Sequence, residues 1–397
     1  MSEDNRLFYA SDCLHFRGDI PCKPHKQFGV HCSGCEHYLK SAGRILIIKL
    51  GAAGDVLRTT PILGPLAEQY PNHEIWWLTD SPDLVPSQVH KRLLSTWQNF
   101  SVIENTSFDV VYCLDKDPHA CALASRVDAA ERFGYTWGNG RPAPANSLAE
   151  HKFVTGLFDD ISQEVRKSYP QELLELCGFE WKGQEYIIDA PDAPSVSIPE
   201  SCHKGGVGPV IGLNTGCGDR WRAREWPLQY WQTLITDLHT QGYRVLLLGG
   251  PAEHDKNTQI ARETGAIYFG TFPLREFIGV VNLCDVVVTQ VTMALHIALA
   301  LRKRIVLFNN IFNPFEFELY GRGILLQPDK PCRCYFNQVC TNSEYTCMEH
   351  LLPVTVLEAI NNSASITNSA SITNSASVTN STSAQTHELL ADQAPPV

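Results

Sequence analysis

Short unbroken apolar runs recur between residues 44 and 310, and most are followed by a loop and a segment with helical spacing of apolar side chains. Parallel strands that are buried on both faces have this continuous apolar pattern. The order strand, loop, helix, strand predicts βαβ units. The predicted strands are RILIIKL (44–50), EIWWLTD (74–80), DVVYCLD (109–115), VIGLN (210–214), YRVLLLGG (243–250), DVVVTQ (285–290) and RIVLFNN (304–310).

A stretch rich in Pro, Ser and Gly separates these strands into two groups. We therefore predict an α/β protein with two facing Rossmann-like domains, at residues 41–190 and 210–360, joined by a linker at 191–209. Ligands of such sheets bind outside the carboxyl ends of the strands. The sequence thus predicts a binding cleft between the two domains.

The two ends of the chain have a different composition. Residues 1–40 are rich in Cys, His, Gly and Pro and have no hydrophobic periodicity, which favours a compact, metal-stapled appendage. Residues 361–397 contain a six-residue repeat of Ser, Thr and Asn that begins at Ile366. Such a composition buries too little apolar surface to fold alone, so we predict a disordered low-complexity tail.

Composition narrows the class of protein. Of 397 residues, 44% are hydrophobic and 19% are charged, which is typical of a globular protein with two or three domains. The net charge of −11 argues against a nucleic-acid binder. No apolar run approaches the roughly 20 residues of a transmembrane helix, and the first residues have no signal-peptide pattern. We therefore expect a cytoplasmic protein, with peripheral contact to the inner face of the membrane left open.

The first candidate motif is the segment KLGAAGDVLRTTP at residues 49–61. Glycines after a buried strand let the backbone turn sharply and approach a ligand. Asp55 at the end of this turn suits two roles, a general base for an attacking hydroxyl or a cap of the following helix. The spacing alone leaves both roles open.

Two further motifs lie in the second half of the chain. Thr215 and Gly216 form a turn after a strand, and Arg224 is the last of three nearby arginines that suit a phosphate group or a solvated basic turn. Thr292 and Met293 begin a helix whose backbone N–H groups can bind an anion. His296 lies one turn further on, as a structural hydrogen-bonding residue or a catalyst.

These motifs, together with GGPAE at 249–253 and ELYGRG at 318–323, resemble glycosyltransferase family 9, the ADP-heptose:lipopolysaccharide heptosyltransferases. The resemblance runs from about Arg44 to Ile360. It implies the GT-B fold and an inverting glycosyl transfer whose chemistry needs no metal. The implied donor is a nucleotide sugar, ADP-heptose, and the acceptor is a lipopolysaccharide core sugar or a protein hydroxyl.

The resemblance also implies roles for single residues. Asp55 matches the proposed general base, and Glu253 lies in the loop that reaches the donor nucleoside. The implied diphosphate-binding positions are Thr215, Gly216, Arg224, Thr292, Met293 and His296, and structural support is implied for Glu316, Tyr320 and Arg322. Relatives usually have Asp at the position of Val291, where it is thought to contact the donor sugar. This departure keeps three alternatives open: another donor sugar, a nucleotide-sugar-binding or regulatory protein without activity, and a nucleotide-sugar epimerase or hydrolase.

Fourteen cysteines in a reducing compartment favour metal binding over disulfides. The spacing of Cys13, Cys22, Cys32 and Cys35 predicts a structural zinc or iron site, with nearby histidines as reserve ligands. A second candidate cluster contains Cys332, Cys334, Cys340 and Cys347. Two alternatives stay open: that the first cluster is an unliganded turn, and that both clusters meet in one site. The oligomeric state is not predicted.

Overall fold

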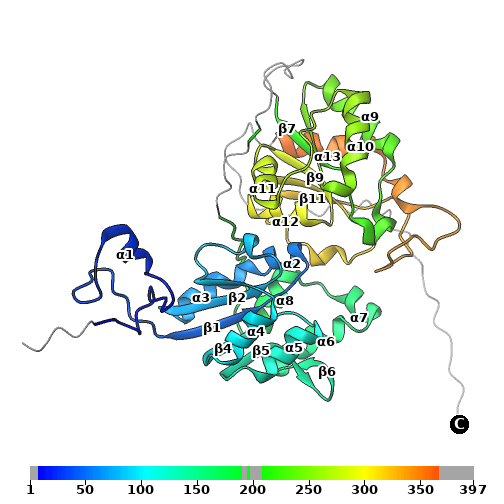
Figure 1. The fold of residues 1–397 in the computed structure, drawn as a ribbon. Helices are drawn as coiled ribbons and strands as arrows, with labels where there is room; N and C mark the ends of the chain where they lie inside the picture. The colour runs from blue at the N-terminus through cyan, green and yellow to red at the C-terminus, as the bar shows by residue number, and fades with distance from the viewer. Residues whose placement is uncertain (1–7, 190–194, 197–207, 366–397) are drawn as a thin grey trace, which may run out of the picture.

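The computed structural model describes residues 8–189, 195–196 and 208–365, and it arranges most of them around two separate sheets with helices beside them (Figure 1). The predicted linker lies outside the described residues, apart from 195–196 and 208–209. The predicted repeat from Ile366 onward lies outside them entirely.

The first sheet contains the strands of the amino-terminal half, in the order β3-β2-β1-β4-β5-β6. Ile45 in the central strand pairs with Ile75 on one side and with Val110 on the other, in parallel register. Only β6 runs antiparallel to its neighbour. The strands are β1 (Gly43–Ile48), β2 (His73–Thr79), β3 (Lys91–Leu94), β4 (Phe108–Cys113), β5 (Ala129–Gly138) and β6 (Arg141–Pro144).

The second sheet is entirely parallel, in the order β11-β10-β9-β7-β8. Its three inner strands are fully buried from Ile211 to Leu213, from Val286 to Gln290 and from Ile305 to Phe308, as their continuous apolar runs predict. The strands are β7 (Val210–Asn214), β8 (Arg244–Leu248), β9 (Val286–Gln290), β10 (Arg304–Phe308) and β11 (Gly323–Leu326).

Helices connect the strands and lie against the sheets. The amino-terminal helices are α1 (Lys23–Phe28), α2 (Ala53–Leu57), α3 (Leu63–Gln69), α4 (Trp97–Glu104), α5 (Pro118–Arg126), α6 (Glu150–Thr155), α7 (Asp159–Glu164) and α8 (Tyr169–Leu176). The second half contains α9 (Leu228–Thr240), α10 (His254–Thr264), α11 (Leu274–Asn282), α12 (Met293–Ala300) and α13 (Pro353–Ser365). None of the helices in the described ranges combines the length and apolar composition needed to span a membrane.

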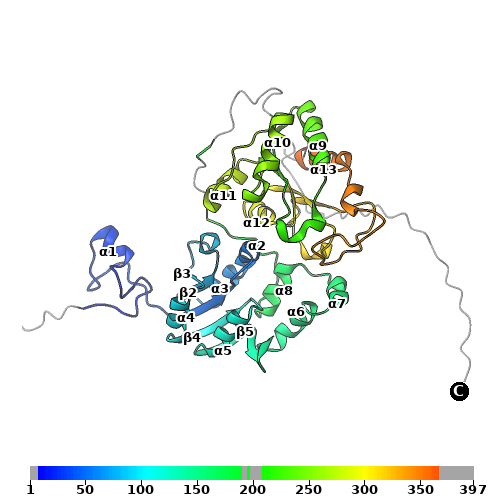
Figure 2. The same cartoon turned by 45° about the vertical axis from the view of Figure 1, so that its right-hand side comes forward.

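The two halves meet through α2 and α12, which lie side by side between the sheets in both views (Figures 1 and 2). A Cβ atom at Gly54 of α2 would lie 2.5 Å from Cδ2 of His296 on α12. Glycine at this position therefore allows the two helices to approach closely. Because each helix follows the carboxyl end of a strand, this contact brings the two predicted ligand-binding edges together.

The apolar spacing of LRTTPILGPLAEQY (57–70) predicts one helix, and the composition of residues 137–150 predicts a loop, and both of these local predictions were wrong. The segment after the first strand is not one helix, because it breaks into α2, a 3-10 helix at Thr60–Ile62 and α3. Pro61 cannot donate within a helix, and the hydroxyls of Thr59 and Thr60 bond back to the carbonyls of Asp55 and Leu57 at 2.7 Å. Residues 137–150 are not simply a loop, because an Asn139–Gly140 turn connects β5 to β6 as a hairpin.

The described residues before the first sheet, 8–42, form a separate segment beside it, the amino-terminal excursion (Figure 2). An isolated bridge between Cys13 and Lys40 closes this segment on itself. At the other end, α13 extends to Ser365, past the predicted start of the tail at residue 361.

Candidate active site

The loop between β1 and α2 is fixed by a buried lysine and an aspartate from the neighbouring strand. Lys49 is only 5% exposed, and its Nζ lies 3.3 Å from Oδ2 of Asp115, which follows β4. The same carboxylate accepts the backbone N–H groups of Leu50 and Gly51. Lys49 Nζ also lies 4.0 Å from Oδ2 of Asp55. This arrangement holds the loop that presents Asp55.

The contacts of Asp55 bear on both of the roles that the sequence left open. Its Oδ2 accepts the backbone N–H of Ala52 at 3.3 Å, which caps the start of α2. Its Oδ1 forms a 2.8 Å ion pair with Nε of Arg58, and the side chain stays 31% exposed. Burial acts to raise the pKa of Asp55, but Arg58, Lys49 and His296 together lower it below its usual value. The carboxylate is therefore ionised at neutral pH and able to accept a proton.

Arg58 connects Asp55 to the second half of the molecule. Its Nη1 lies 2.7 Å from Oε1 of Glu316, which ends a 3-10 helix at Pro314–Glu316. Its guanidinium also stacks over the ring of Tyr169, 3.5 Å from the centroid. Charges of alternating sign thus run from Lys49 through Asp55 and Arg58 to Glu316. The sequence motifs contained Arg58 and Glu316 but gave no signal that they touch.

His296 is buried against the same helix start. Its Nδ1 lies 3.4 Å from the hydroxyl of Tyr186. Burial, reinforced by the charge of Arg58, lowers the pKa of His296 to about 3. The imidazole is therefore neutral at physiological pH, and it acts as a hydrogen-bonding and packing group beside Asp55.

In the second sheet, one amide holds the ends of β7 and β9 together. Asn214 Nδ2 donates to Gly216 O, Thr289 Oγ1 and Thr292 Oγ1, each at 3.2 Å. With its hydroxyl bonded in this way, Thr292 does not cap α12, which Met293 begins. The first backbone N–H groups of α12 therefore have no side-chain cap and suit an anion.

The turn after β7 is packed against α10 and the loop before it. A Cβ atom at Gly216 would lie 2.1 Å from Oε1 of Glu253, so the two predicted site residues are in direct contact. Thr215 Oγ1 lies 2.5 Å from Oδ1 of Asn257, and Thr215 O accepts the ammonium of Lys256 at 3.0 Å. Lys256 adds a positive charge here that the sequence motifs did not identify.

Arg224 lies between this turn and α12, and it is only 3% exposed. Its two terminal nitrogens donate to the carbonyls of Val291 and Cys217. Its Nε has no hydrogen-bond partner, and none of the described ion pairs joins Arg224 to a carboxylate. Burial lowers the pKa of Arg224 to about 10, which leaves it charged at neutral pH. The structure thus brings an uncompensated buried cation to the predicted diphosphate site.

Gln290, the last residue of β9, and Val291, which follows it, differ in their partners. The carbonyl of Val291 binds Arg224, and its side chain packs against the core. Gln290 is fully buried, and neither its Oε1 nor its Nε2 has a hydrogen-bond partner. A polar residue at the end of an apolar strand was a sequence signal for Gln290 that the motif analysis missed.

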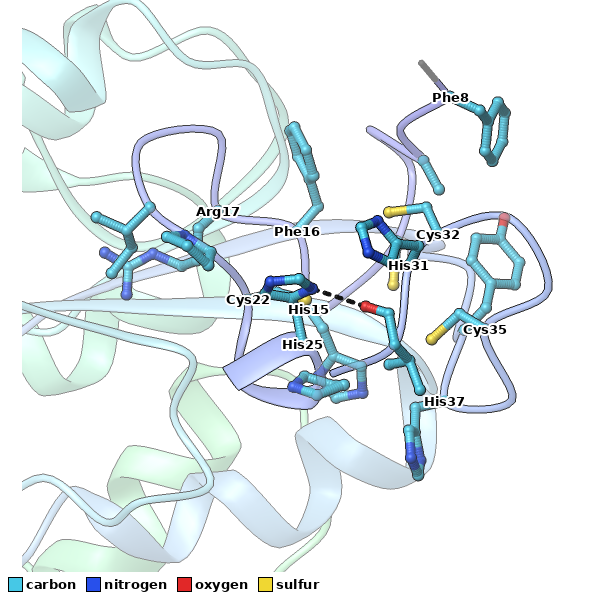
Figure 3. Close-up of a pocket in the computed structure, with 17 residues that line it drawn as sticks. Phe8, His15, Phe16, Arg17, Cys22, His25, His31, Cys32, Cys35 and His37 are labelled. Carbon is cyan, nitrogen blue, oxygen red and sulfur yellow. Dashed lines mark hydrogen bonds between the residues drawn. The ribbon is translucent and has the colours of Figure 1, made fainter. Parts of the chain in front are cut away.

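The amino-terminal cysteines surround one cavity of about 270 Å³ (Figure 3). The cysteine and histidine side chains that line it are Cys13, Cys22, Cys32, Cys35, His15, His25, His31 and His37. All four thiols are free, and across the described ranges no three Cys, His, Asp or Glu side chains are assembled as a metal-binding group. The cysteines therefore share a cavity without forming a finished ligand set.

The second cysteine cluster lies in the loop between β11 and α13. It is found on the far side of the molecule from the amino-terminal excursion in both views (Figures 1 and 2). The alternative in which both clusters meet in one site is therefore wrong.

Comparison with known proteins shows what part of this chain resembles. Residues 161–335 match the family model described as glycosyltransferase family 9 (heptosyltransferase). Among curated proteins, none matches the sequence. The predicted resemblance to this family is confirmed.

Three solved structures share the fold at low sequence identity. A family 9 glycosyltransferase from Veillonella parvula is 17% identical with a TM-score of 0.60, covering 82% of this chain and 98% of its own. The E. coli heptosyltransferase WaaC with ADP-2-deoxy-2-fluoro heptose is 14% identical with a TM-score of 0.55. The match covers 81% of this chain and 100% of the WaaC chain. The iron-containing dodecameric glycosyltransferase TibC from enterotoxigenic E. coli is 15% identical with a TM-score of 0.51. The match covers 83% of this chain and 78% of the TibC chain. These matches confirm the predicted GT-B architecture.

Proposed function

We propose that this chain, a family 9 glycosyltransferase by its match over residues 161–335, transfers heptose from ADP-heptose to a hydroxyl of a lipopolysaccharide core sugar or a protein. The observation that carries the proposal is the buried guanidinium of Arg224, which has no carboxylate partner among the described ion pairs. An unpaired buried charge costs several kcal/mol, and a diphosphate would compensate it.

The proposed diphosphate site has three parts around this cation. The turn at Thr215 and Gly216 lies on one side, and the uncapped start of α12 at Thr292 and Met293 lies on the other. Backbone N–H groups and a guanidinium directed at one anion stabilise charge as it develops on a leaving group. Glu253 contacts Gly216, which supports a role for its loop in holding the donor nucleoside.

We propose Asp55 as the general base. It is ionised, partly exposed and set at the carboxyl end of β1, on the helix that faces α12. It would take the proton from the acceptor hydroxyl as that oxygen attacks the anomeric carbon opposite the diphosphate. The new bond forms as the bond to the diphosphate breaks, so the anomeric configuration inverts. No step of this displacement uses a metal.

The heptose donor is supported by the likeness to WaaC, whose structure holds a fluorinated ADP-heptose. Val291 presents an apolar side chain and cannot bond a sugar hydroxyl. This one observation favours a second candidate function, a nucleotide-sugar-binding protein without transfer. We place the transfer in the cytoplasm, at the inner face of the membrane when the acceptor is lipopolysaccharide.

The test incubates the purified full chain with ADP-heptose, other nucleotide sugars and deacylated core acceptors, with products read by mass spectrometry. A glycosylated acceptor and an equal amount of released ADP are expected, and Asp55→Asn is the matched inactive control. ADP release without acceptor would indicate a hydrolase, and binding without turnover would indicate the second candidate. Absence of nucleotide binding would overturn both.

We further propose a structural zinc or iron ion bound by Cys13, Cys22, Cys32 and Cys35. Four free thiols around one cavity suit these thiophilic ions. In the described part of this segment, buried side chains are few, with Ala10 as its sole member of the hydrophobic core. A bound ion would supply the order that apolar packing does not.

A further inference from the structure

Residues 184–189 form an interdomain strap, because they contact both halves of the molecule. Toward the first sheet, the N–H of Ile187 donates to Thr60 Oγ1 at 2.9 Å. The backbone N–H and the hydroxyl of Ser87 each donate to Oδ1 of Asp189, also at 2.9 Å. This end of the strap is thereby fixed to the amino-terminal half.

The other end of the interdomain strap is fixed to the second half of the chain. The carbonyl of Gln184 accepts the hydroxyl of Tyr320 at 2.9 Å. The carboxylate of Glu185 accepts both terminal nitrogens of Arg322, each at 2.9 Å. Such a bidentate pair fixes geometry as well as adding energy. Tyr186 therefore lies between two anchored stretches of the strap.

Tyr186 is also held by packing, and it is only 6% exposed. Its ring stacks on the ring of His296, with centroids 5.9 Å apart and an interplanar angle of 18°. Tyr320 meets the Tyr186 ring edge to face at 6.0 Å. The hydroxyl of Tyr186 lies 3.4 Å from Nδ1 of His296, and among the described residues it has no other hydrogen-bond partner. The ring and the hydroxyl of Tyr186 thus both act on His296.

The direction of this hydrogen bond follows from the number of protons. His296 is neutral, because burial and the charge of Arg58 lower its pKa to about 3. A neutral imidazole has a proton on one nitrogen and a lone pair on the other. If Nδ1 of His296 donated, the hydroxyl proton of Tyr186 would have no acceptor at a buried position, which costs free energy. The hydroxyl of Tyr186 therefore donates, and Nδ1 accepts.

We infer that Tyr186 is a positioning residue for His296, because its hydroxyl selects the tautomer with the proton on Nε2. Nε2 lies toward α2, since a Cβ atom at Gly54 would be 3.2 Å from it. The imidazole thus presents a hydrogen-bond donor where α2 meets α12. An N–H at this place suits an oxygen of a diphosphate, whereas a lone pair would repel it. This use of the donor rests on the proposed function, in which the start of α12 binds the diphosphate.

The first experiment observes the tautomer by NMR in the full chain labelled with ¹⁵N-histidine. Long-range ¹H–¹⁵N spectra distinguish protonated from unprotonated ring nitrogens, and His296→Ala identifies the His296 signals among those of 14 histidines. Wild-type protein should show His296 protonated on Nε2 and not on Nδ1. In Tyr186→Phe, which keeps the ring, the two tautomers should mix. A proton on Nδ1 in the wild type, or an unchanged tautomer in Tyr186→Phe, would overturn the inference.

Tyr320→Phe is the matched control for the NMR experiment. It removes a hydroxyl that holds the same interdomain strap through Gln184, and that hydroxyl does not bond His296. The tautomer of His296 should stay as in the wild type. The same mixing in both variants would show that the strap acts by general rigidity, which would overturn the role of the Tyr186 hydroxyl. His296→Gln serves for the signal assignment if His296→Ala does not fold.

The second experiment measures ADP affinity by calorimetry. Tyr186→Phe should weaken ADP binding by about two- to tenfold, as expected for one lost hydrogen bond. In a His296→Ala background, Tyr186→Phe should cause no further loss, because the two residues act as one unit. A full loss in that background would overturn the action through His296. Wild-type protein with the expected tautomer that binds no ADP would instead overturn the proposed function and leave the tautomer assignment standing.

Discussion

At the scale of single residues, Asp55 carries two contacts that one substitution can separate. In Asp55→Asn the amide oxygen can still accept the N–H of Ala52, so the cap of α2 is kept while the basic carboxylate is lost. We expect glycosyl transfer to fall by about 10²- to 10⁴-fold, with ADP affinity within a few-fold of wild type. Steady-state kinetics and calorimetry measure the two effects. A joint loss of ADP binding and thermal stability would assign Asp55 to capping alone.

Glu316 shares the positive charge of Arg58 with the carboxylate of Asp55. In Glu316→Gln, Arg58 keeps Asp55 as its remaining carboxylate among the described ion pairs. The pKa of Asp55, already lowered by Arg58 and Lys49, should then fall further. Activity is lost when Asp55 is protonated, so the acidic limb of the kcat profile should move to lower pH. The weaker base should also lower kcat at neutral pH by about two- to tenfold.

Glu185→Gln is the matched control for this pH profile. Glu185 accepts two 2.9 Å bonds from Arg322, an ion pair that does not involve Arg58. Its removal should leave the acidic limb where it is. The same shift in both variants would show that Glu316 acts through general loosening rather than through Arg58.

Arg224 is distinguished from its neighbours by burial. Arg224→Ala should weaken ADP binding by about 10- to 100-fold, because a charge-assisted contact in a buried site is lost. Arg220 and Arg222 are exposed, so Arg220→Ala and Arg222→Ala should change the affinity little. Calorimetric titration of all three variants with ADP decides the point. Similar losses in the three would indicate a diffuse basic loop.

At the scale of elements, the amino-terminal excursion should depend on its proposed ion. Cys32→Ser with Cys35→Ser should remove about one metal ion per chain and make residues 1–40 sensitive to protease. The two sheets should stay folded, because their cores contain none of the described residues of this segment. Elemental analysis and limited proteolysis provide the measurements. A metal-depleted segment that remains protected would show that its cysteines are packing residues.

Strands that are buried on both faces were easier to predict from the sequence than half-buried strands or breaks between helices. Continuous apolar runs gave β1, β2, β4 and all of the second sheet except β11, because both faces of those strands are buried. The half-buried β3 and β11 have no such run. The break between α2 and α3 depends on the hydroxyl bonds of Thr59 and Thr60, which apolar spacing does not reveal.

In the candidate site, the sequence predicted individual residues but not the contacts between them. Local motifs were enough to select Asp55 and Arg224, since each follows a strand in a recognisable turn. Their partners were not predicted, because Glu316 lies 258 positions from Arg58 and Val291 lies 67 positions from Arg224. Such pairs are set by how the two sheets and their loops pack, and a single sequence contains no local trace of them.

At the scale of the whole molecule, the contact between α2 and α12 sets the distance between the proposed base and the diphosphate site. Gly54→Ala should force these helices apart, because its Cβ would lie 2.5 Å from His296 Cδ2. We expect a loss of about 1–3 kcal/mol in stability and at least about tenfold in transfer. Thermal unfolding and kinetics test both.

Gly64→Ala is the matched control for that substitution. A Cβ at Gly64 meets nothing within 4 Å, and alanine is a good helix former in the first turn of α3. This variant should keep its activity. Equal damage from both substitutions would show that the loss does not come from the contact between α2 and α12.

The contact of Gly54 with His296 also has an evolutionary consequence. A side chain at position 54 fits only if position 296 becomes smaller, and a larger residue at 296 has no space while α2 keeps its place. Neither position can therefore drift alone. Among descendants of this chain, the two should change together or not at all, although His296 lies 242 positions from Gly54 along the sequence.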